Sequence, residues 1–226
     1  MRNERIDPAV AGLRVENGLP VRRFYSWPGK PNKEGRWWSS TMQAHVAHES
    51  LLEREYLLIA DYVPQIIAVV SQPVALLWPT GIPGHRYHVP DFFVRYSDGG
   101  GRLVDVRTPT RLAESRTQFA MTSQACREIG WEYEVFTGSA PGWIRNLEWI
   151  GRYRHPRYAP EPSLAQQITG LLAYPVCLDV GIRAVAAAAA IPRAQALQNI
   201  YHLLWHQRLA VDLSAGELSM DTVVHA

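Results

Sequence analysis

The sequence is poor in lysine, in cysteine and in long apolar runs. Lys30 and Lys33 are the only lysines among its 226 residues, so its basic side chains are nearly all arginine. Two isolated cysteines, Cys126 and Cys177, are too few for a disulfide scaffold or a zinc site, which fits a reducing compartment. The longest apolar run, residues 184–191, is far too short to span a membrane.

The opening residues, MRNERIDPAV, contain no apolar stretch of the kind that a secretory signal needs. We therefore expect a cytoplasmic protein that does not associate with membranes. Apolar residues make up 47% of the chain and aromatic residues 10%, which predicts a folded protein with a sizeable core. The net charge of only +2 is a weak indication of an anionic partner.

Residues 1–40 form a polar extension that is interrupted by prolines and rich in arginine. Its aromatic residues are Phe24, Tyr25, Trp27, Trp37 and Trp38. Basic and aromatic side chains on an irregular segment can stack on bases and bind phosphates. The same composition also suits an extension that packs on the main domain, and we favour this second interpretation.

Residues 41–155 alternate between helical and strand patterns. The expected elements are a helix over 48–62, a strand over 66–77 with a bend at Pro73, a loop over 78–84, a hairpin over 89–109, a helix over 111–129, a strand over 132–137 and a helix over 142–153. This order predicts an α/β fold with an αβββαβ core, in which a mixed sheet is flanked by helices.

The predicted hairpin carries an acidic residue on each arm. Phe92–Tyr96 and Leu103–Val106 are the expected strands, and a glycine-rich turn joins them. Cross-strand partners in a hairpin have a constant index sum, so Asp91 and Asp105 should lie within a residue or two of each other. Two carboxylates at that distance repel unless they share a proton or bind a cation. The more specific hypothesis is therefore a divalent metal site. Taken alone, the hairpin favours the alternative, an ordinary hairpin with acidic strand ends.

Five short motifs stand out between residues 37 and 154. They are Ser50-Leu-Leu-Glu53, Ser71-Gln72-Pro73, Pro90-Asp91-Phe92-Phe93-Val94, Val104-Asp105-Val106-Arg107 and Asn146-Leu-Glu-Trp149-Ile150. In this order they resemble the endonuclease subunit of heteromeric transposases, the TnsA-like family of the PD-(D/E)xK nuclease superfamily. The resemblance implies a restriction-endonuclease-like core in a bacterial cytoplasmic enzyme. It further implies hydrolysis of a phosphodiester at transposon ends in double-stranded DNA, beside a DDE-type transposase subunit and an AAA+ ATPase regulator.

Carried over by position, the resemblance makes Glu53, Asp91 and Asp105 metal ligands, together with the backbone carbonyl of Val106. Oxygen ligands of this kind suit Mg²⁺, for which Mn²⁺ can substitute, and the metal activates a bound water. The sequence departs from the family pattern at two positions. Arg107 stands where the pattern has lysine, and Asp105 where it has Glu or Gln.

The arginine leaves the activity open. Arginine stays protonated, so Arg107 can stabilise charge on a phosphate but cannot act as a general base. An active endonuclease subunit is our first hypothesis. The alternatives are a stand-alone restriction or repair nuclease of the same fold, and a catalytically degenerate nuclease fold that serves as a DNA-binding or assembly subunit. Glu53 itself has an ordinary alternative, a solvated charge at the margin of the apolar face of its helix.

Residues 160–226 follow a proline-rich linker and are predicted to form a winged-helix-like domain. Helical patterns over 163–173, 181–190 and 193–207 are followed by two short strand patterns. The residues that would open the third helix and face DNA are Arg193, Gln195, Gln198 and Asn199. Docking of a partner protein is an equal alternative for this domain.

Histidines are also considered as site residues. His85 and His88 flank the hairpin, where solvated loop side chains are expected and DNA contact is the alternative. His202 and His206 are four residues apart, a spacing that can bind zinc, but no third ligand is evident.

Overall fold

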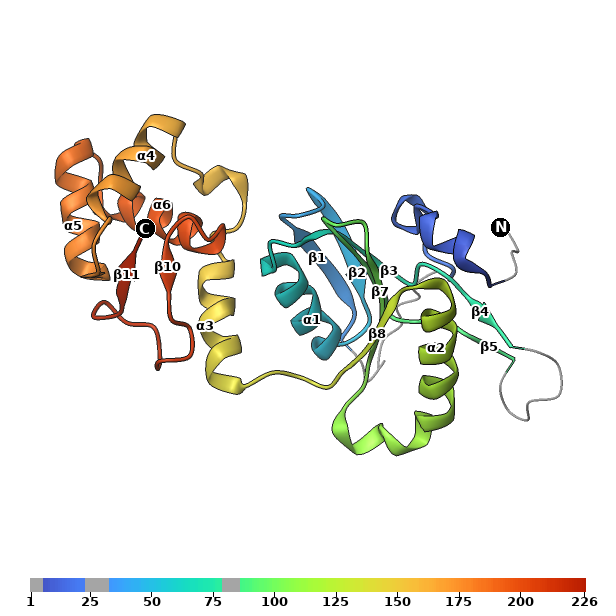
Figure 1. The fold of residues 1–226 in the computed structure, drawn as a ribbon. Helices are drawn as coiled ribbons and strands as arrows, with labels where there is room; N and C mark the ends of the chain where they lie inside the picture. Colours follow the sequence, from blue (N-terminus) through green and yellow to red (C-terminus); the bar gives the residue numbers. More distant parts are fainter. Residues whose placement is uncertain (1–5, 23–32, 79–85) are drawn as a thin grey trace. The chain divides into compact units, whose positions relative to one another are not determined.

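The computed structural model describes residues 6–22, 33–78 and 86–226 (Figure 1). The chain divides into two compact units, Met1–Gly138 and Ser139–Ala226. Several predictions lie outside the described residues. They concern Phe24, Tyr25 and Trp27 as stacking residues, the loop over 79–84, and His85.

A four-stranded mixed sheet with the strand order β3-β6-β7-β8 forms the centre of the first unit. Its strands are β3 (Ile66–Ser71), β6 (Phe92–Tyr96), β7 (Gly101–Val106) and β8 (Glu132–Phe136). The first three strands pair antiparallel, whereas β8 runs parallel to β7 because α2 (Arg116–Ile129) crosses over between them. With α1 (Leu51–Tyr62) ahead of β3, the predicted mixed α/β core is confirmed. A short ladder of β4 (Leu76–Leu77) and β5 (Tyr87–His88) is inserted before the hairpin.

The two helices cover opposite faces of this sheet (Figure 1). Neighbouring residues on a strand point to opposite faces, and β6 shows this directly. Phe92 stacks on Tyr56 of α1, with ring centroids 5.5 Å apart. Phe93 points the other way, into a buried cluster with Cys126 and Ile129 of α2. The hairpin strand β6 is therefore buried on both sides, which fixes the position of the acidic residue that precedes it.

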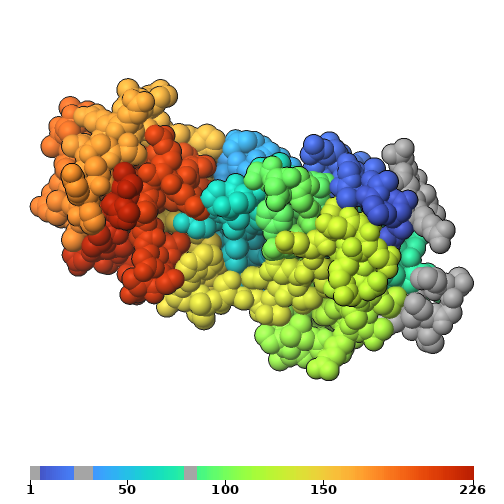
Figure 2. Space-filling model, in the orientation of Figure 1, coloured from blue at the N-terminus to red at the C-terminus, as the bar shows by residue number. Residues whose placement is uncertain are grey.

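The first 50 residues contain more structure than the sequence predicts. A hairpin of β1 (Gly35–Ser39) and β2 (Ala44–His48) forms where the irregular extension was expected to end. Residues 6–22 form short 3-10 turns whose apolar side chains, including Val10 and Val15, pack against the Phe93 cluster. Figure 2 shows this segment in blue against the yellow-green α2. The described part of the extension is thus packed on the core, in agreement with the interpretation favoured above.

The second unit combines helices with a small antiparallel sheet of strand order β10-β11-β9. Its elements are α3 (Pro141–Gly151), α4 (Pro162–Leu171), β9 (Val176–Cys177), α5 (Leu178–Ala189), α6 (Arg193–Trp205), β10 (Ala210–Val211) and β11 (Val223–His225). The proline-rich linker predicts a domain boundary near residues 155–162, whereas the chain divides after Gly138. The reason is that α3 packs on α6, and its Asn146 amide donates to the carbonyls of Leu213 and Gly216 at 2.9 and 2.6 Å.

Among the described helices, none has the length and apolar character needed to cross a membrane.

We expect acid to destabilise the second unit through His202. The side chain is buried, and its Nδ1 bonds the carbonyl oxygen of Tyr153 at 2.8 Å. Burial, with a smaller contribution from His206, lowers the pKa of His202 to about 4. A lowered pKa means that the unfolded chain binds the proton more tightly, so stability falls as the pH drops from about 6.5 to about 4. We compare the free energy of unfolding in urea at pH 7 and at pH 4.5. Between these pH values it should fall by roughly 1–3 kcal/mol more in the native protein than in His202→Gln. The exposed His225, changed to Gln, is the control and should leave the native difference unchanged.

Candidate active site

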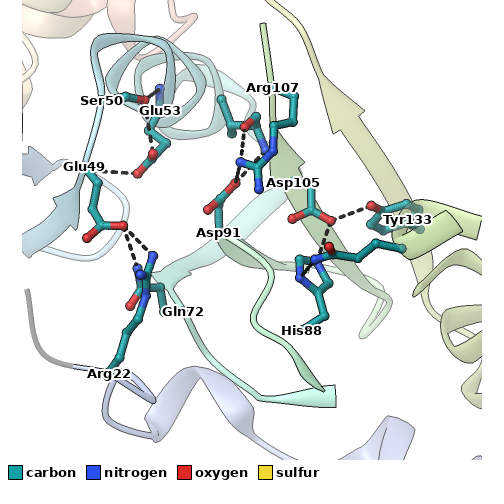
Figure 3. A network of polar contacts seen from close by, with 12 residues as sticks. Arg22, Glu49, Ser50, Glu53, Gln72, His88, Asp91, Asp105, Arg107 and Tyr133 are labelled. Atoms are coloured by element: carbon teal, nitrogen blue, oxygen red, sulfur yellow. Dashed lines mark hydrogen bonds and ion pairs between the residues drawn. The ribbon is translucent and has the colours of Figure 1, made fainter. Parts of the chain in front are cut away.

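The hairpin of β6 and β7 brings Asp91 and Asp105 together at one end of the sheet (Figure 3). Phe92 pairs with Val104 and Phe93 with Leu103, so the same register continued by one residue puts Asp91 opposite Asp105. The backbone amide of Val106 donates to Asp91 Oδ2 at 2.7 Å. The predicted proximity of the two carboxylates is therefore confirmed.

Glu53 reaches the same region from the first turn of α1. Ser50 is the N-cap of this helix, and its Oγ accepts a hydrogen bond from the Glu53 amide at 3.1 Å. In return, the Glu53 carboxylate accepts from the Glu49 amide at 2.7 Å and from Ser50 Oγ at 3.0 Å. This is a variant of the capping box, in which the glutamate reaches the amide one residue before the cap. Glu53 is thus not a solvated rim charge, and burial raises its pKa. The Ser-x-x-Glu spacing in the sequence is the signal that could have revealed this role.

Asp91 lies in the most crowded electrostatic environment of the site. Burial, followed by the negative charges of Glu53 and Asp105, raises the pKa of Asp91 to about 7. Arg107 opposes this shift only partly, with its Nη1 3.6 Å from Asp91 Oδ2. A bound cation would relieve the repulsion among these carboxylates.

The backbone of Asp91 is fixed by Gln72, the central residue of the Ser71-Gln72-Pro73 motif. Gln72 adopts a left-handed conformation with φ of 48°, which is uncommon for a residue with a side chain. Its amide donates to the Asp91 carbonyl at 2.8 Å, and its own carbonyl accepts from the Val21 amide at 2.9 Å. The Gln72 side chain reaches Glu49 Oε2 at 3.3 Å, an oxygen that also pairs with Arg22. Gln72 therefore hydrogen-bonds the N-terminal segment, the residue Glu49 just before α1 and the backbone of Asp91.

The two oxygens of Asp105 differ in their surroundings, although the whole side chain is buried. Oδ2 accepts from His88 Nε2 at 2.8 Å and from the Tyr133 hydroxyl at 2.5 Å. Oδ1 is buried without a hydrogen-bond partner. His88 is only 4% exposed, so the expectation of a solvated loop side chain is wrong for this residue. Sequence reasoning missed Tyr133 altogether, because nothing local marks a tyrosine on β8 as a neighbour of β7.

Arg107 occupies the lysine position of the family pattern and is partly accessible. Its Nη1 donates to the carbonyl oxygen of Val106 at 2.9 Å. The carbonyl that was predicted as a metal ligand is therefore already hydrogen-bonded. About a third of the Arg107 side chain, 34%, is exposed, so its remaining donors can reach a phosphate in solvent.

Residues 63–138 match the family described as TnsA-like endonuclease N terminal. The resemblance to the TnsA-like endonucleases is thereby confirmed. The TnsA-like region, as we call residues 63–138, contains Asp91, Asp105 and Arg107, whereas Glu53 and the Asn146–Ile150 motif lie outside it. No curated protein matches the chain.

The acidic pair in the TnsA-like region fits a hard divalent cation. Within residues 6–22, 33–78 and 86–226, no three His, Cys, Asp or Glu side chains are grouped to hold a metal ion, and Glu53 is engaged in its cap. Asp91 and Asp105 nevertheless supply carboxylate oxygens, and one of them, Asp105 Oδ1, is buried without a partner. Mg²⁺ keeps several water ligands and needs only one or two carboxylates. Two aspartates are therefore sufficient in chemistry and charge.

The candidate DNA-binding residues lie in the second unit, beyond the TnsA-like region, and only part of the set is accessible. The Arg193 guanidinium pairs with Asp179 at 2.6 Å. Asn199 is buried, and its amide donates to the Tyr158 carbonyl at 3.0 Å. It therefore does not face solvent as predicted, because the segment after α3 covers this side of α6. Gln195 is exposed and Gln198 is half-buried.

Proposed function

We propose that this chain is a metal-dependent DNA endonuclease subunit of a heteromeric transposase, which hydrolyses a phosphodiester at transposon ends. One observation carries the proposal: within the TnsA-like region, Asp91 and Asp105 face each other at the end of a buried hairpin, where burial and the neighbouring carboxylates raise the pKa of Asp91. Acidic residues are costly in such a place unless a cation balances them. The cation expected is Mg²⁺, with Mn²⁺ as a substitute.

Each polar residue of the site has a distinct task in this proposal. Asp91 and Asp105 would hold the metal, which when bound supplies an activated water and positive charge beside the phosphate. Glu53 keeps the start of α1 in place and adds negative charge that favours a divalent over a monovalent ion. Arg107 would donate hydrogen bonds to the scissile phosphate and stabilise the charge that develops there. Because Arg107 cannot accept a proton, the proton of the attacking water must pass to another group of the site, to the DNA or to solvent.

The second unit supports a role within a larger assembly. The order α4, β9, α5, α6, β10, β11, with β11 between the other two strands, is the order of a winged helix, and we propose that fold for it. Its third helix is covered by the segment after α3, since Tyr153 stacks on Tyr201 with ring centroids 5.0 Å apart. We infer that this unit docks onto a partner, either the DDE-type transposase or the AAA+ ATPase regulator, in preference to inserting α6 into DNA.

A degenerate nuclease that acts as a scaffold is the second candidate. It is favoured by the Arg107–Val106 hydrogen bond and by the Glu53 cap, since both engage groups that the family pattern would place around a metal. Such a scaffold would keep the fold and would bind DNA or the other subunits without cleaving DNA.

The test combines calorimetry with plasmid cleavage. Mn²⁺ is titrated into the native full-length protein and into Asp91→Asn at pH 8. In a separate assay, both proteins are incubated with a supercoiled plasmid that carries the transposon ends. Cleavage is measured with the protein alone and with the DDE-type transposase added.

Each outcome separates the hypotheses. Metal binding that depends on Asp91, with cleavage that requires the transposase, is the expected result. Cleavage by the chain alone would favour a restriction or repair enzyme. Metal binding without cleavage in either mixture, or no metal binding at all, would favour the scaffold.

A further inference from the structure

The buried network around Asp105 is built from four separate elements. Asp105 lies on β7, His88 on β5, Tyr133 on β8 and Gln118 on α2. β5 is held in place by antiparallel pairing with β4, in which His88 lies opposite Leu76. β8 is fixed by its parallel register with β7, in which Asp105 pairs with Val135. The donors that reach Asp105 are therefore held by the fold and not by flexible loops.

The orientation of the His88 ring follows from its two neighbours. The Gln118 side chain lies against Nδ1. Nε2 lies 2.8 Å from Asp105 Oδ2, and because a carboxylate oxygen accepts hydrogen bonds, Nε2 donates to it. Tyr133 donates to the same oxygen. One oxygen of the carboxylate is thus saturated by two donors, while the other, Oδ1, is buried without a partner.

We propose that His88 and Tyr133 are positioning residues that hold Asp105 so that it offers a single oxygen, Oδ1, to the metal. The inference rests on the function proposed above. A carboxylate that is free to rotate can bind a cation through both oxygens, as it often does with Ca²⁺, whereas Mg²⁺ demands near-ideal octahedral geometry. Hydrogen bonds that fix Oδ2 therefore hold the Asp105 carboxylate in one orientation before the metal binds, and they favour Mg²⁺ over the larger Ca²⁺. Groups in this position behind a metal ligand contribute about 10–100-fold to metal affinity.

Four substitutions separate positioning from folding. Tyr133→Phe removes only the hydroxyl, and His88→Leu removes the imidazole donor. His88→Gln keeps an N–H donor of similar reach. Tyr96→Phe, at the far end of β6 from Asp91, is the control for the loss of a tyrosine hydroxyl. Mn²⁺ and Ca²⁺ binding by each full-length variant is measured by calorimetry at pH 8 without DNA, and melting temperature is recorded in parallel.

We expect Mn²⁺ to bind about 10–100-fold more weakly to Tyr133→Phe and His88→Leu, with a smaller loss for Ca²⁺. His88→Gln and Tyr96→Phe should bind Mn²⁺ within about threefold of the native protein. Should Tyr133→Phe lower the melting temperature but keep native Mn²⁺ affinity, the residues would be structural and the inference overturned. This outcome can be read from Tyr133→Phe even if His88→Leu does not fold.

Asp91→Asn in the same titration distinguishes this failure from that of the proposed function. If native protein and Asp91→Asn take up Mn²⁺ equally, or not at all, the metal site itself is absent and both proposals fall. If Asp91→Asn loses binding while Tyr133→Phe and His88→Leu retain it, the positioning role alone is wrong.

Discussion

Asp91→Asn should abolish metal binding and at the same time make the metal-free protein more stable at pH 8. The reason is the environment of the carboxylate, in which burial and the charges of Glu53 and Asp105 raise its pKa to about 7. Above that pH, Asp91 is ionised in the folded protein at a cost. The isosteric amide avoids this cost, and its oxygen can still accept the 2.7 Å hydrogen bond from the Val106 amide.

The sign and the size of the gain depend on pH. A raised pKa means that the folded state favours the protonated carboxyl, so this contribution to stability is lost as the pH rises from about 4 through about 7. The full shift corresponds to about 4 kcal/mol, and relaxation around the charge reduces it to roughly 1–3 kcal/mol. Asp91→Asn should therefore melt several degrees higher than native protein at pH 8, and close to it at pH 4.5.

Metal binding should show the complementary pH dependence. Because the metal must displace the Asp91 proton, Mn²⁺ affinity should fall up to about tenfold for each pH unit below 7 and level off above it. Asp98→Asn is the matched control, since Asp98 lies in the exposed turn of the same hairpin and bonds only the Gly100 amide among the contacts seen for it. A gain in stability for Asp98→Asn equal to that for Asp91→Asn would show that general charge reduction, and not the acidic pair, is responsible.

The acidic pair could be predicted because a hairpin encodes its own register. The turn between β6 and β7 sets the index sum of the pairs, and the burial of Phe92 and Phe93 on opposite faces prevents a shift by one residue. The turn and the alternation of buried residues are therefore enough to predict that Asp91 and Asp105 lie together.

The partners of Asp105 could not be predicted in this way. His88 and Tyr133 come from strands joined to the hairpin by a loop and by a helical crossover, and neither connection sets a register that can be deduced from turn residues. Whether the N-terminal segment binds nucleic acid or packs on the core also could not be deduced from the sequence. Its arginines and aromatics are typical both of a nucleic-acid arm and of a packed extension, and the composition does not reveal that Arg95, on the central strand, needs a partner from it.

Glu16→Ala should cost roughly 3–5 kcal/mol of stability, although Glu16 lies in a segment with only short 3-10 turns. Its carboxylate accepts from Arg95 Nε at 3.2 Å and Nη2 at 3.1 Å. Arg95 is 3% exposed and also donates to the carbonyls of Leu13 and Gly99. Burial acts to raise the pKa of Glu16, but the hydrogen bonds and charge of Arg95 outweigh it and leave the pKa lowered. Removing the carboxylate would strand a buried guanidinium.

Arg14→Ala provides the matched control, because Arg14 pairs with Oε1 of the same carboxylate at 3.4 Å while 68% of its side chain is exposed. An exposed ion pair of this kind contributes about 0–1 kcal/mol. Replacing both members of the buried pair, Glu16→Leu with Arg95→Met, should recover most of the loss, since no charge is then left unpaired.

The free energy of unfolding in urea is measured for the native protein, Glu16→Ala, Arg14→Ala and the double variant. If Glu16→Ala costs no more than Arg14→Ala, the segment is not part of the folded core in solution, and its arginines become available for DNA. If it costs several kcal/mol, deleting the segment cannot serve as a test of DNA binding, because the deletion would destabilise the core that presents Asp91 and Asp105.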